Sequence, residues 1–321
     1  MEIGLFYYVW YNGTFGQGHW NGTPIDDPTS KKWTVIDEPL LGFYNSSDYK
    51  VIKQHMEWFK LLGIDFLIVS WWGKDSFEDA MTKILFQQTA VDNPDLKIVI
   101  MVEGFNETAD SYDFGYIRNY IKSTYYDVYP NVAVKINDLP VLCWYNADNM
   151  TGTLEKPRSE RVEQIHNDSL FENRILGHNT QYVDWYAWTP CTDDSSRLPV
   201  LSRDGFTVIE PRYDHSHINS SHTPYDPDYD EGLYGEQWDQ VESWYATRDV
   251  RYVAVYSWNE YHERSQIEPH ESIEDDYVLK PFVETYRYII PEFKLFLILA
   301  PFFAATLLAV ILYRKRIIHY L

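Results

Sequence analysis

The feature that most constrains this chain is an apolar strand that ends in a cluster of polar side chains. Residues 252–258 are β-branched and aromatic with almost no charge, a pattern typical of a strand covered on both faces of a parallel sheet. The side chains of Asn259, Glu260, His262 and Glu263 follow directly. Since α/β barrels and open α/β sheets carry their chemistry at the carboxyl ends of their strands, we predict a functional site here.

Glu260 and Glu263 are three residues apart, so one turn can direct both carboxyl groups into the same cleft. In a shared pocket their pKa values can separate, which supplies a general acid and a general base worth about 10²- to 10⁴-fold each in rate. Glycoside hydrolysis requires such a pair of carboxyl groups. Because a bare pair of glutamates is more often solvated on a loop, the rest of the sequence has to decide between these interpretations.

Other segments support the first interpretation. Residues 258–269 read W-N-E-Y-H-E-R-S-Q-I-E-P, and residues 6–11 read F-Y-Y-V-W-Y. Between them lie G-H-W at 18–20, G-F-Y-N-S-S-D at 42–48, S-W-W-G at 70–73 and P-R-Y-D at 211–214. In the same order, these segments resemble the signatures of glycoside hydrolase family 99, the endo-α-1,2-mannosidases and mannanases, whose main motif is N-E-W-H-E-G-T-Q-I-E. The resemblance extends from residue 2 to about residue 290.

The resemblance implies a retaining, endo-acting α-mannoside hydrolase in which the 2-hydroxyl of the sugar attacks the anomeric carbon and forms a 1,2-anhydro sugar. Glu260 would take the proton of the 2-hydroxyl. Glu263 would protonate the leaving oxygen and later activate water. For these roles Glu263 has to stay protonated in a drier environment, whereas Glu260 has to accept hydrogen bonds in its ionised form.

The resemblance also implies sugar-binding side chains around the two acids. Glu103 ends the predicted strand 97–102 as Glu260 ends its own, and in the family an acid at this early strand end lines the sugar subsite. Each candidate also has a structural interpretation: the aromatic rings as core, Glu103 as a capping or ion-paired acid, and His262 as a structural hydrogen bonder. The expected substrate-binding residues are Tyr8, Trp10, Trp72, Glu103, Tyr213, Asn259 and His262.

The signature departs from the family pattern at three positions. Tyr261 replaces the usual Trp, and Arg264 with Ser265 replaces a Gly-Thr pair, which predicts a bulky cation beside the acids. These changes leave the substrate open. Two alternatives therefore remain: a glycan-binding barrel of surface-polysaccharide metabolism that lacks turnover, and an endo-α-glucanase-like glycosidase.

Alternating strand and helix patterns predict an α/β fold, a (β/α)₈ barrel of the TIM type that occupies residues 1–290. The pattern itself gives about seven strands, and the strand 174–177 is the candidate for the one missing between residues 146 and 181. The predicted strands are 3–10, 65–71, 97–102, 141–145, 174–177, 182–188, 206–209 and 252–258. The predicted helices are 48–62, 77–89, 113–125, 234–248 and 277–288.

The composition of the chain limits the classes of ligand that it is expected to bind. A net charge of -21 argues against nucleic acid, because phosphate binding needs clustered Lys and Arg. The aromatic content of 17% suits a carbohydrate cleft, since flat rings stack on the apolar faces of sugars. We predict neither a cofactor nor a metal, because His215, His217 and His222 lack partners at the spacing of a structural site. Whether Cys143 and Cys191 form a disulfide stays open.

The end of the chain predicts a membrane anchor. Residues 295–313 are uncharged and long enough for one transmembrane helix, preceded by a short linker at 291–294 and followed by a basic tail at 314–321. The positive-inside rule then places the catalytic domain outside the cell or in a lumen. N-glycosylation sequons agree with export and occur at Asn12, Asn21, Asn45, Asn106, Asn149, Asn167 and Asn219.

The start of the chain conflicts with this prediction. No signal peptide is visible before the first predicted strand. Either the start is trimmed or misassigned, or the helix is a tail anchor and the domain faces the cytosol. The sequons favour the first explanation.

Overall fold

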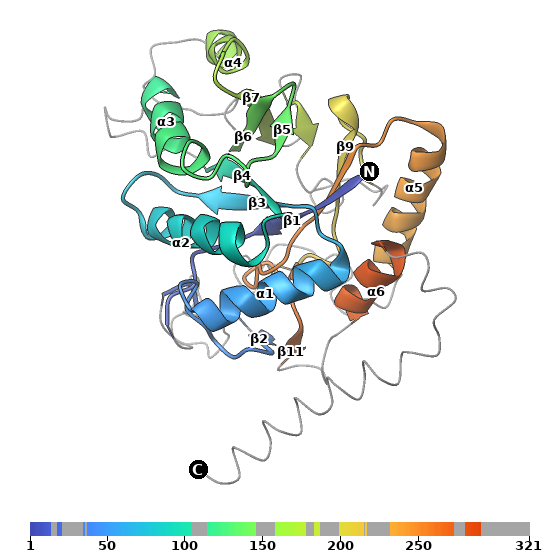
Figure 1. The fold of residues 1–321 in the computed structure, drawn as a ribbon. Helices are drawn as coiled ribbons and strands as arrows, with labels where there is room; N and C mark the ends of the chain where they lie inside the picture. The colour runs from blue at the N-terminus through green and yellow to red at the C-terminus, as the bar shows by residue number, and fades with distance from the viewer. Residues whose placement is uncertain are drawn as a thin grey trace.

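The computed structural model describes residues 1–13, 18–20, 35, 37–103, 114–145, 158–177, 183–186, 199–214, 216, 232–272 and 280–289. They form an α/β fold around a curled parallel sheet with the strand order β8-β7-β6-β4-β3-β1-β10-β9. Figure 1 shows β1 near the middle of this sheet, with the helices outside it. The strands of the sheet are β1 (Glu2–Tyr7), β3 (Phe66–Trp71), β4 (Lys97–Val102), β6 (Leu139–Tyr145), β7 (Glu172–Gly177), β8 (Trp185–Tyr186), β9 (Phe206–Ile209) and β10 (Tyr252–Val255).

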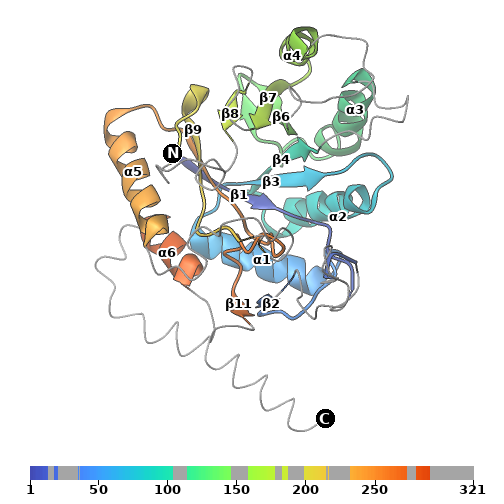
Figure 2. The same cartoon turned by 180° about the vertical axis from the view of Figure 1, so that it is seen from behind.

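The helices cover the outer face of the sheet, and the view from behind in Figure 2 shows the same arrangement. Helix α1 contacts α2 and α6, and α5 contacts both α6 and β9. The helices are α1 (Tyr49–Leu62), α2 (Phe77–Asp92), α3 (Phe114–Ile121), α4 (Arg158–His166), α5 (Leu233–Thr247) and α6 (Lys280–Ile289). A π-helical turn, η2 (Lys122–Tyr126), continues α3.

Alternation along the strands divides the core into two layers, because successive side chains point to opposite faces of a sheet. Along β1, Leu5 and Tyr7 pack against the helices, whereas Phe6 packs among inward-facing side chains of the other strands. All three are buried. The inner layer fills the space that the curled sheet encloses, as in a barrel.

The two edges of the curled sheet meet through side chains. Trp185 on β8 stacks on Phe206 on β9, with ring centroids 4.2 Å apart and planes within 7°. Among the described residues, the hydrogen-bonded strand order ends at β8 on one side and at β9 on the other. The α/β prediction is therefore confirmed as a curled, barrel-like sheet whose described edges are joined by packed rings.

Most predicted elements are present, with shifted ends. Strand 174–177 is confirmed within β7, whereas the predicted strand 182–188 is reduced to the two residues of β8. Helix α1 begins behind Asp48, whose carboxylate accepts a hydrogen bond from the Lys50 amide, and ends at Gly63 with a φ of 66°. The sequence did not predict α4 or the small antiparallel pair of β2 (Asp37–Pro39) and β11 (His270–Ser272).

The predicted linker 291–294, transmembrane helix 295–313 and basic tail 314–321 lie outside the described residues. Within the described ranges, no helix has the length and apolar character needed to cross a bilayer.

Candidate active site

Glu260 and Glu263 lie on a loop whose two ends pair with each other. Three backbone hydrogen bonds of 2.9 to 3.0 Å join residues 257–258 to residues 265–268. The hydroxyl groups of Ser257 and Ser265 lie 3.0 Å apart across this stem, and the Glu260 amide donates to the Ser257 hydroxyl at 2.8 Å. The loop directly follows β10, so both acids lie at the carboxyl end of the sheet, where the sequence predicted them.

Asn259 fastens this loop to the end of β1. Its side-chain carbonyl accepts a hydrogen bond from the Tyr8 amide at 2.8 Å, and its side-chain nitrogen donates to the Tyr8 carbonyl at 2.9 Å. Because Asn259 is fully buried and its amide group is engaged in these bonds, it positions Tyr8 beside the acids. Its predicted contact with substrate stays a prediction.

The carboxyl group of Glu263 is held by two tyrosines from neighbouring strand ends. Tyr213, beyond β9, donates to Oε1 at 3.1 Å, and Tyr256, at the end of β10, donates to Oε2. Tyr256 in turn accepts a hydrogen bond from the Tyr8 hydroxyl at 3.1 Å. Tyr213 and Tyr8 were predicted to belong to the site. Tyr256 was missed, since it reads as one more core aromatic, and only its inward position in the strand marks it.

Glu103 extends from the end of β4 as predicted. Its side chain is 8% exposed, and it accepts a hydrogen bond from the Ser70 hydroxyl at 2.8 Å. Ser70 also accepts from the Trp72 indole at 3.0 Å, which orients a ring that is 49% exposed. Burial raises the pKa of Glu103 to about 7, an effect that Ser70 opposes and the charge of Glu263 increases.

Tyr8 lies among three carboxyl groups. Burial raises the pKa of its hydroxyl well above the usual range, and the charges of Glu260, Glu103 and Glu263 each contribute to that rise. These three acids come from two strand ends that are distant in the sequence, at β4 and β10. They therefore occupy one environment, as the prediction of paired acids requires.

The two predicted catalytic acids both have raised pKa values. Burial raises the pKa of Glu260 well above its ordinary value, and the charge of Glu263 adds to the effect, although backbone N–H groups of His262 and Glu263 oppose it. Burial also raises the pKa of Glu263, against hydrogen bonds from its two tyrosines. Glu260 is the more buried of the two. Both carboxyl groups therefore keep their protons to a higher pH than an exposed glutamate does, and the division of roles between them stays a prediction.

An aromatic stack forms one wall beside these acids. The ring of Trp10 lies between Tyr8, with centroids 4.4 Å apart, and the exposed ring of His19, at 4.6 Å. Trp72 lies 6.5 Å from Trp10. His262 meets His19 edge-on at 6.0 Å, and burial together with His19 lowers the pKa of His262 to about 4. Flat rings beside carboxyl groups suit a sugar, and His19 is a member that the prediction left out.

Glu268, the last acid of the signature, lies beneath the loop rather than beside Glu260 and Glu263. It is fully buried and bonds to His55 on α1 at 2.9 Å through Oε1. Its Oε2 accepts hydrogen bonds from Tyr44 at 2.9 Å and from Tyr261 at 3.1 Å. Since Tyr44 also accepts a hydrogen bond from the Asn259 side chain at 3.1 Å, Glu268 supports the active loop from beneath. Tyr261, one of the three residues at which the signature departs from the family pattern, belongs to this support.

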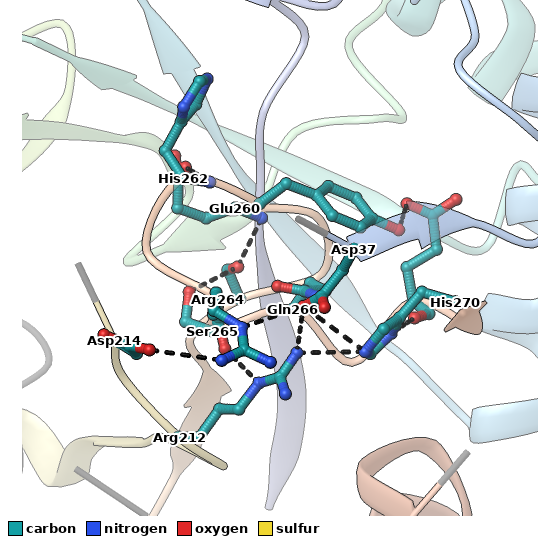
Figure 3. A network of polar contacts seen from close by, with 12 residues as sticks. Asp37, Arg212, Asp214, Glu260, His262, Arg264, Ser265, Gln266 and His270 are labelled. Atoms are coloured by element: carbon teal, nitrogen blue, oxygen red, sulfur yellow. Dashed lines mark hydrogen bonds and ion pairs between the residues drawn. The ribbon is translucent and has the colours of Figure 1, made fainter. Parts of the chain in front are cut away.

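The prediction that a cation lies beside the acids is wrong in one respect. Arg264 does follow Glu263, but its guanidinium is buried against Asp37 at 3.4 Å and Asp214 at 3.3 Å. Figure 3 shows the side chain pointing away from Glu260 and His262. The backbone of Arg264 is left-handed, with a φ of 51°.

Metal and cysteine predictions concern mostly other parts of the chain. Among the residues that the structure describes, no group of three or more His, Cys, Asp or Glu side chains could hold a metal ion. Cys143 is a free, buried thiol on β6. Its possible partner Cys191 and the histidines 215, 217 and 222 lie outside the described residues.

The raised pKa of Glu103 predicts a pH-dependent stability. Between the ordinary value of 4.5 and about 7, the folded protein keeps a proton that the unfolded chain has lost, so stability decreases as pH rises through this window. Glu103→Gln removes this linkage. We expect the variant to gain roughly 2–3 kcal/mol relative to the parent between pH 4.5 and pH 8, measured by urea unfolding. A difference that does not change with pH would contradict the assignment.

A curled parallel sheet with paired carboxyl groups at its strand ends, beside stacked aromatic rings, is the arrangement that barrel glycosidases use. The fold itself is similar to the glycoside hydrolase family 99 (GH99) endo-alpha-mannosidase from Bacteroides thetaiotaomicron, with a TM-score of 0.66, 16% identity, and coverage of 91% of this chain and 97% of that chain. The resemblance predicted from the sequence is thus confirmed at the level of the fold.

Two further solved structures have the same fold. A second structure of the GH99 endo-alpha-mannosidase from Bacteroides thetaiotaomicron, in complex with bis-tris-propane, matches with a TM-score of 0.61, 18% identity and coverage of 91% and 97% of the two chains. A glycoside hydrolase-like protein matches with a TM-score of 0.57, 14% identity and coverage of 90% and 93%. Neither a protein-family model nor a curated protein matches the sequence.

Proposed function

We propose that the chain is a retaining, endo-acting α-mannoside hydrolase of the family 99 type. The observation that carries the proposal is the convergence of Glu260 and Glu263, on one anchored loop, with Glu103 around Tyr8. The fold, which is that of a family 99 endo-alpha-mannosidase, supports it. The substrate would be an α-mannose-containing glycan or polysaccharide.

In the proposed reaction the sugar supplies the nucleophile. Glu260 accepts the proton of the 2-hydroxyl while that oxygen attacks the anomeric carbon, and Glu263 donates its proton to the departing oxygen. Water then opens the 1,2-anhydro sugar at the anomeric carbon, gives its proton to Glu263, and the 2-oxygen recovers its proton from Glu260. Two inversions at the same carbon retain the configuration.

The bound sugar would determine which of the two acids is ionised and which is protonated. A 2-hydroxyl that donates to Glu260 favours the ionised form of that carboxyl group, and a glycosidic oxygen that accepts from Glu263 favours its protonated form. The amide of His262, which donates to Glu260 Oε1 at 2.9 Å, already favours ionised Glu260. Substrate binding thus prepares the acid and the base for their roles.

The surroundings of the site match a sugar chain rather than a single small molecule. Trp10, Trp72 and His19 provide flat faces, and Trp72 is exposed. With regard to location, we propose a single-pass membrane protein anchored by residues 295–313, with the catalytic domain outside the cell or in a lumen. The sequons and the basic tail support this orientation.

Incubation with a panel of α-mannans and α-glucans, with the products identified by mass, tests the proposal. Internal cleavage of an α-mannan that leaves the glucans intact is the expected result. Cleavage of α-glucans alone would favour a glucanase. Binding of glycans without products would favour a barrel that has lost turnover.

A small cation offers a test that does not depend on the natural glycan. Bis-tris-propane is bound in a structure of the Bacteroides enzyme, and its amines are cationic near neutral pH. Because Glu103, Glu260 and Glu263 have raised pKa values, they become available as anions only as pH rises. We therefore expect binding to tighten at least about tenfold from pH 5 to pH 7 by titration calorimetry.

The matched control for this titration is Glu271→Gln, which changes an exposed glutamate outside the site. It should bind the amine as the parent does. Glu263→Gln should flatten the pH dependence. An affinity that is the same at pH 5 and pH 7 in the parent would mean that the carboxyl groups do not face the ligand.

A further inference from the structure

The segment that follows β9 forms hydrogen bonds with Glu263, the proposed general acid, and with its neighbour Arg264. Arg212 Nε donates to the Arg264 carbonyl at 2.5 Å, and the Asp214 amide donates to the Glu263 carbonyl at 2.7 Å. Between these two contacts, the Tyr213 hydroxyl bonds the Glu263 carboxyl group itself. Three consecutive residues therefore hold the backbone and the side chain of this short stretch.

A buried ionic cluster holds this segment and the loop together. Arg212 Nη2 lies 2.5 Å from Asp37 Oδ2, and Arg264 bridges Asp37 and Asp214. Gln266 also donates to Asp37, at 2.6 Å. Figure 3 shows the two guanidinium groups side by side beneath the loop. The four charged residues are almost completely excluded from solvent, with residue exposures of 0 to 4%.

The charges of this cluster balance. Burial raises the pKa of Asp37, but Arg212, His270 and Arg264 outweigh it and hold that pKa well below the usual range. Burial lowers the pKa of His270 to about 4, so His270 is neutral near pH 7, and its Nε2 lies 3.0 Å from Arg212 Nη2. Two arginines then face two aspartates. Removing one partner of such a buried set leaves an uncompensated charge.

The backbone of Arg264 shows that this cluster has a cost. A φ of 51° is left-handed, a conformation that strains a residue with a Cβ atom and that glycine adopts freely. The family signature has glycine at this position, which would avoid the strain. Contacts of the side chain offset this backbone strain, because Nε lies near Asp37 and Nη1 lies near Asp214.

We propose that Arg264 is a positioning residue, which acts through Asp214 and Asp37 to hold Glu263 against Tyr213 and Tyr256. This inference rests on the proposed function, because it assigns to Arg264 the placement of the proposed acid. The Asp214 amide and Arg212 Nε hold the carbonyl groups of Glu263 and Arg264, which belong to the two peptide groups on either side of Arg264. A shift of the acid by about 1 Å can reduce the rate about 10²-fold.

Arg264→Gly is the sharpest variant, since it relieves the left-handed strain while it removes the cluster contacts. We expect kcat on the cleaved glycan to decrease about 10²-fold with little change in KM. The loss of the tyrosine hydrogen bonds should also raise the pKa of Glu263, which moves the alkaline limb of the pH–rate profile upward. The titratable groups that face Glu263 are Glu260, Glu103, Tyr8, Tyr213 and Tyr256.

Arg264→Lys is the second variant, which retains the charge in case the glycine variant does not fold. An ammonium group lacks the planar fork, so we expect a smaller decrease of kcat and a smaller shift of the same limb. The control is Arg251→Gly, which removes an exposed arginine paired with exposed Asp249. It should leave both quantities unchanged.

NMR titration of the Glu263 carboxyl carbon in the parent and in each Arg264 variant separates this inference from the proposed function. If the parent hydrolyses no glycan, the proposed function fails, whereas an upward shift of the Glu263 titration in the variants still supports the positioning. If the parent is active and both variants keep its kcat and its Glu263 titration, the positioning role of Arg264 is overturned.

Discussion

Glu263→Gln is expected to reduce hydrolysis of an unactivated α-mannoside glycan by about 10³-fold, within the range of a lost general acid. The amide can still accept the hydrogen bonds of Tyr213 and Tyr256 at one position, so the loop should keep its shape. What the variant lacks is a proton for the departing oxygen. Initial rates on a defined glycan, with products identified by mass, measure the effect.

An aryl α-mannoside with an acidic phenol as leaving group provides the comparison. Such a phenol departs without a proton, so release of the phenol by Glu263→Gln should be much closer to that of the parent. Glu260→Gln should be slow on both substrates, because the 2-hydroxyl needs its base in either case. An equal loss on both substrates for Glu263→Gln would remove it from the role of acid.

Glu268→Ala is expected to lower the free energy of unfolding by about 3–5 kcal/mol, because it leaves buried partners uncompensated. His55, Tyr44 and Tyr261 would each lose a hydrogen bond in a region that water does not reach. Urea unfolding followed by tryptophan fluorescence measures the loss. Activity of the folded fraction should also decrease, since Tyr44 connects Glu268 to Asn259.

The control is Glu271→Ala, an exposed acid three positions along the chain. Its removal should change the free energy of unfolding by less than about 0.5 kcal/mol. If Glu268→Ala is equally mild, then Glu268 does not provide the buried hydrogen-bonded support that its contacts indicate.

The strand ends were predictable because two patterns coincide there. An uncharged run such as 97–102 or 252–258 is typical of a buried parallel strand, and the acid that follows each run has to lie at the carboxyl edge of the sheet. Glu103, Glu260 and Glu263 could thus be brought together from the sequence alone. The predicted helices were confirmed for the same reason, since apolar periodicity such as that of α1 depends only on neighbouring residues.

The supports of the site were not predictable, because they depend on pairs that are distant in the sequence. Asp37 meets Arg212 and Arg264 across separations of 175 and 227 residues, and no local pattern announces such a pairing. Asn259 likewise looks like a polar loop residue until the backbone of Tyr8 is placed beside it. The raised pKa of Glu260 also follows from burial, which cannot be read from its neighbours along the chain.

The paired stem of the active loop has a consequence for how the site tolerates change. Since residues 257–258 and 265–268 bond to each other, Glu260 and Glu263 form part of one small unit rather than of two independent strands. The curvature of the sheet can change slightly through thermal motion or through a substitution in an outer helix. Such a change would displace both acids together. The stem thereby limits how far the separation between proton donor and proton acceptor can change.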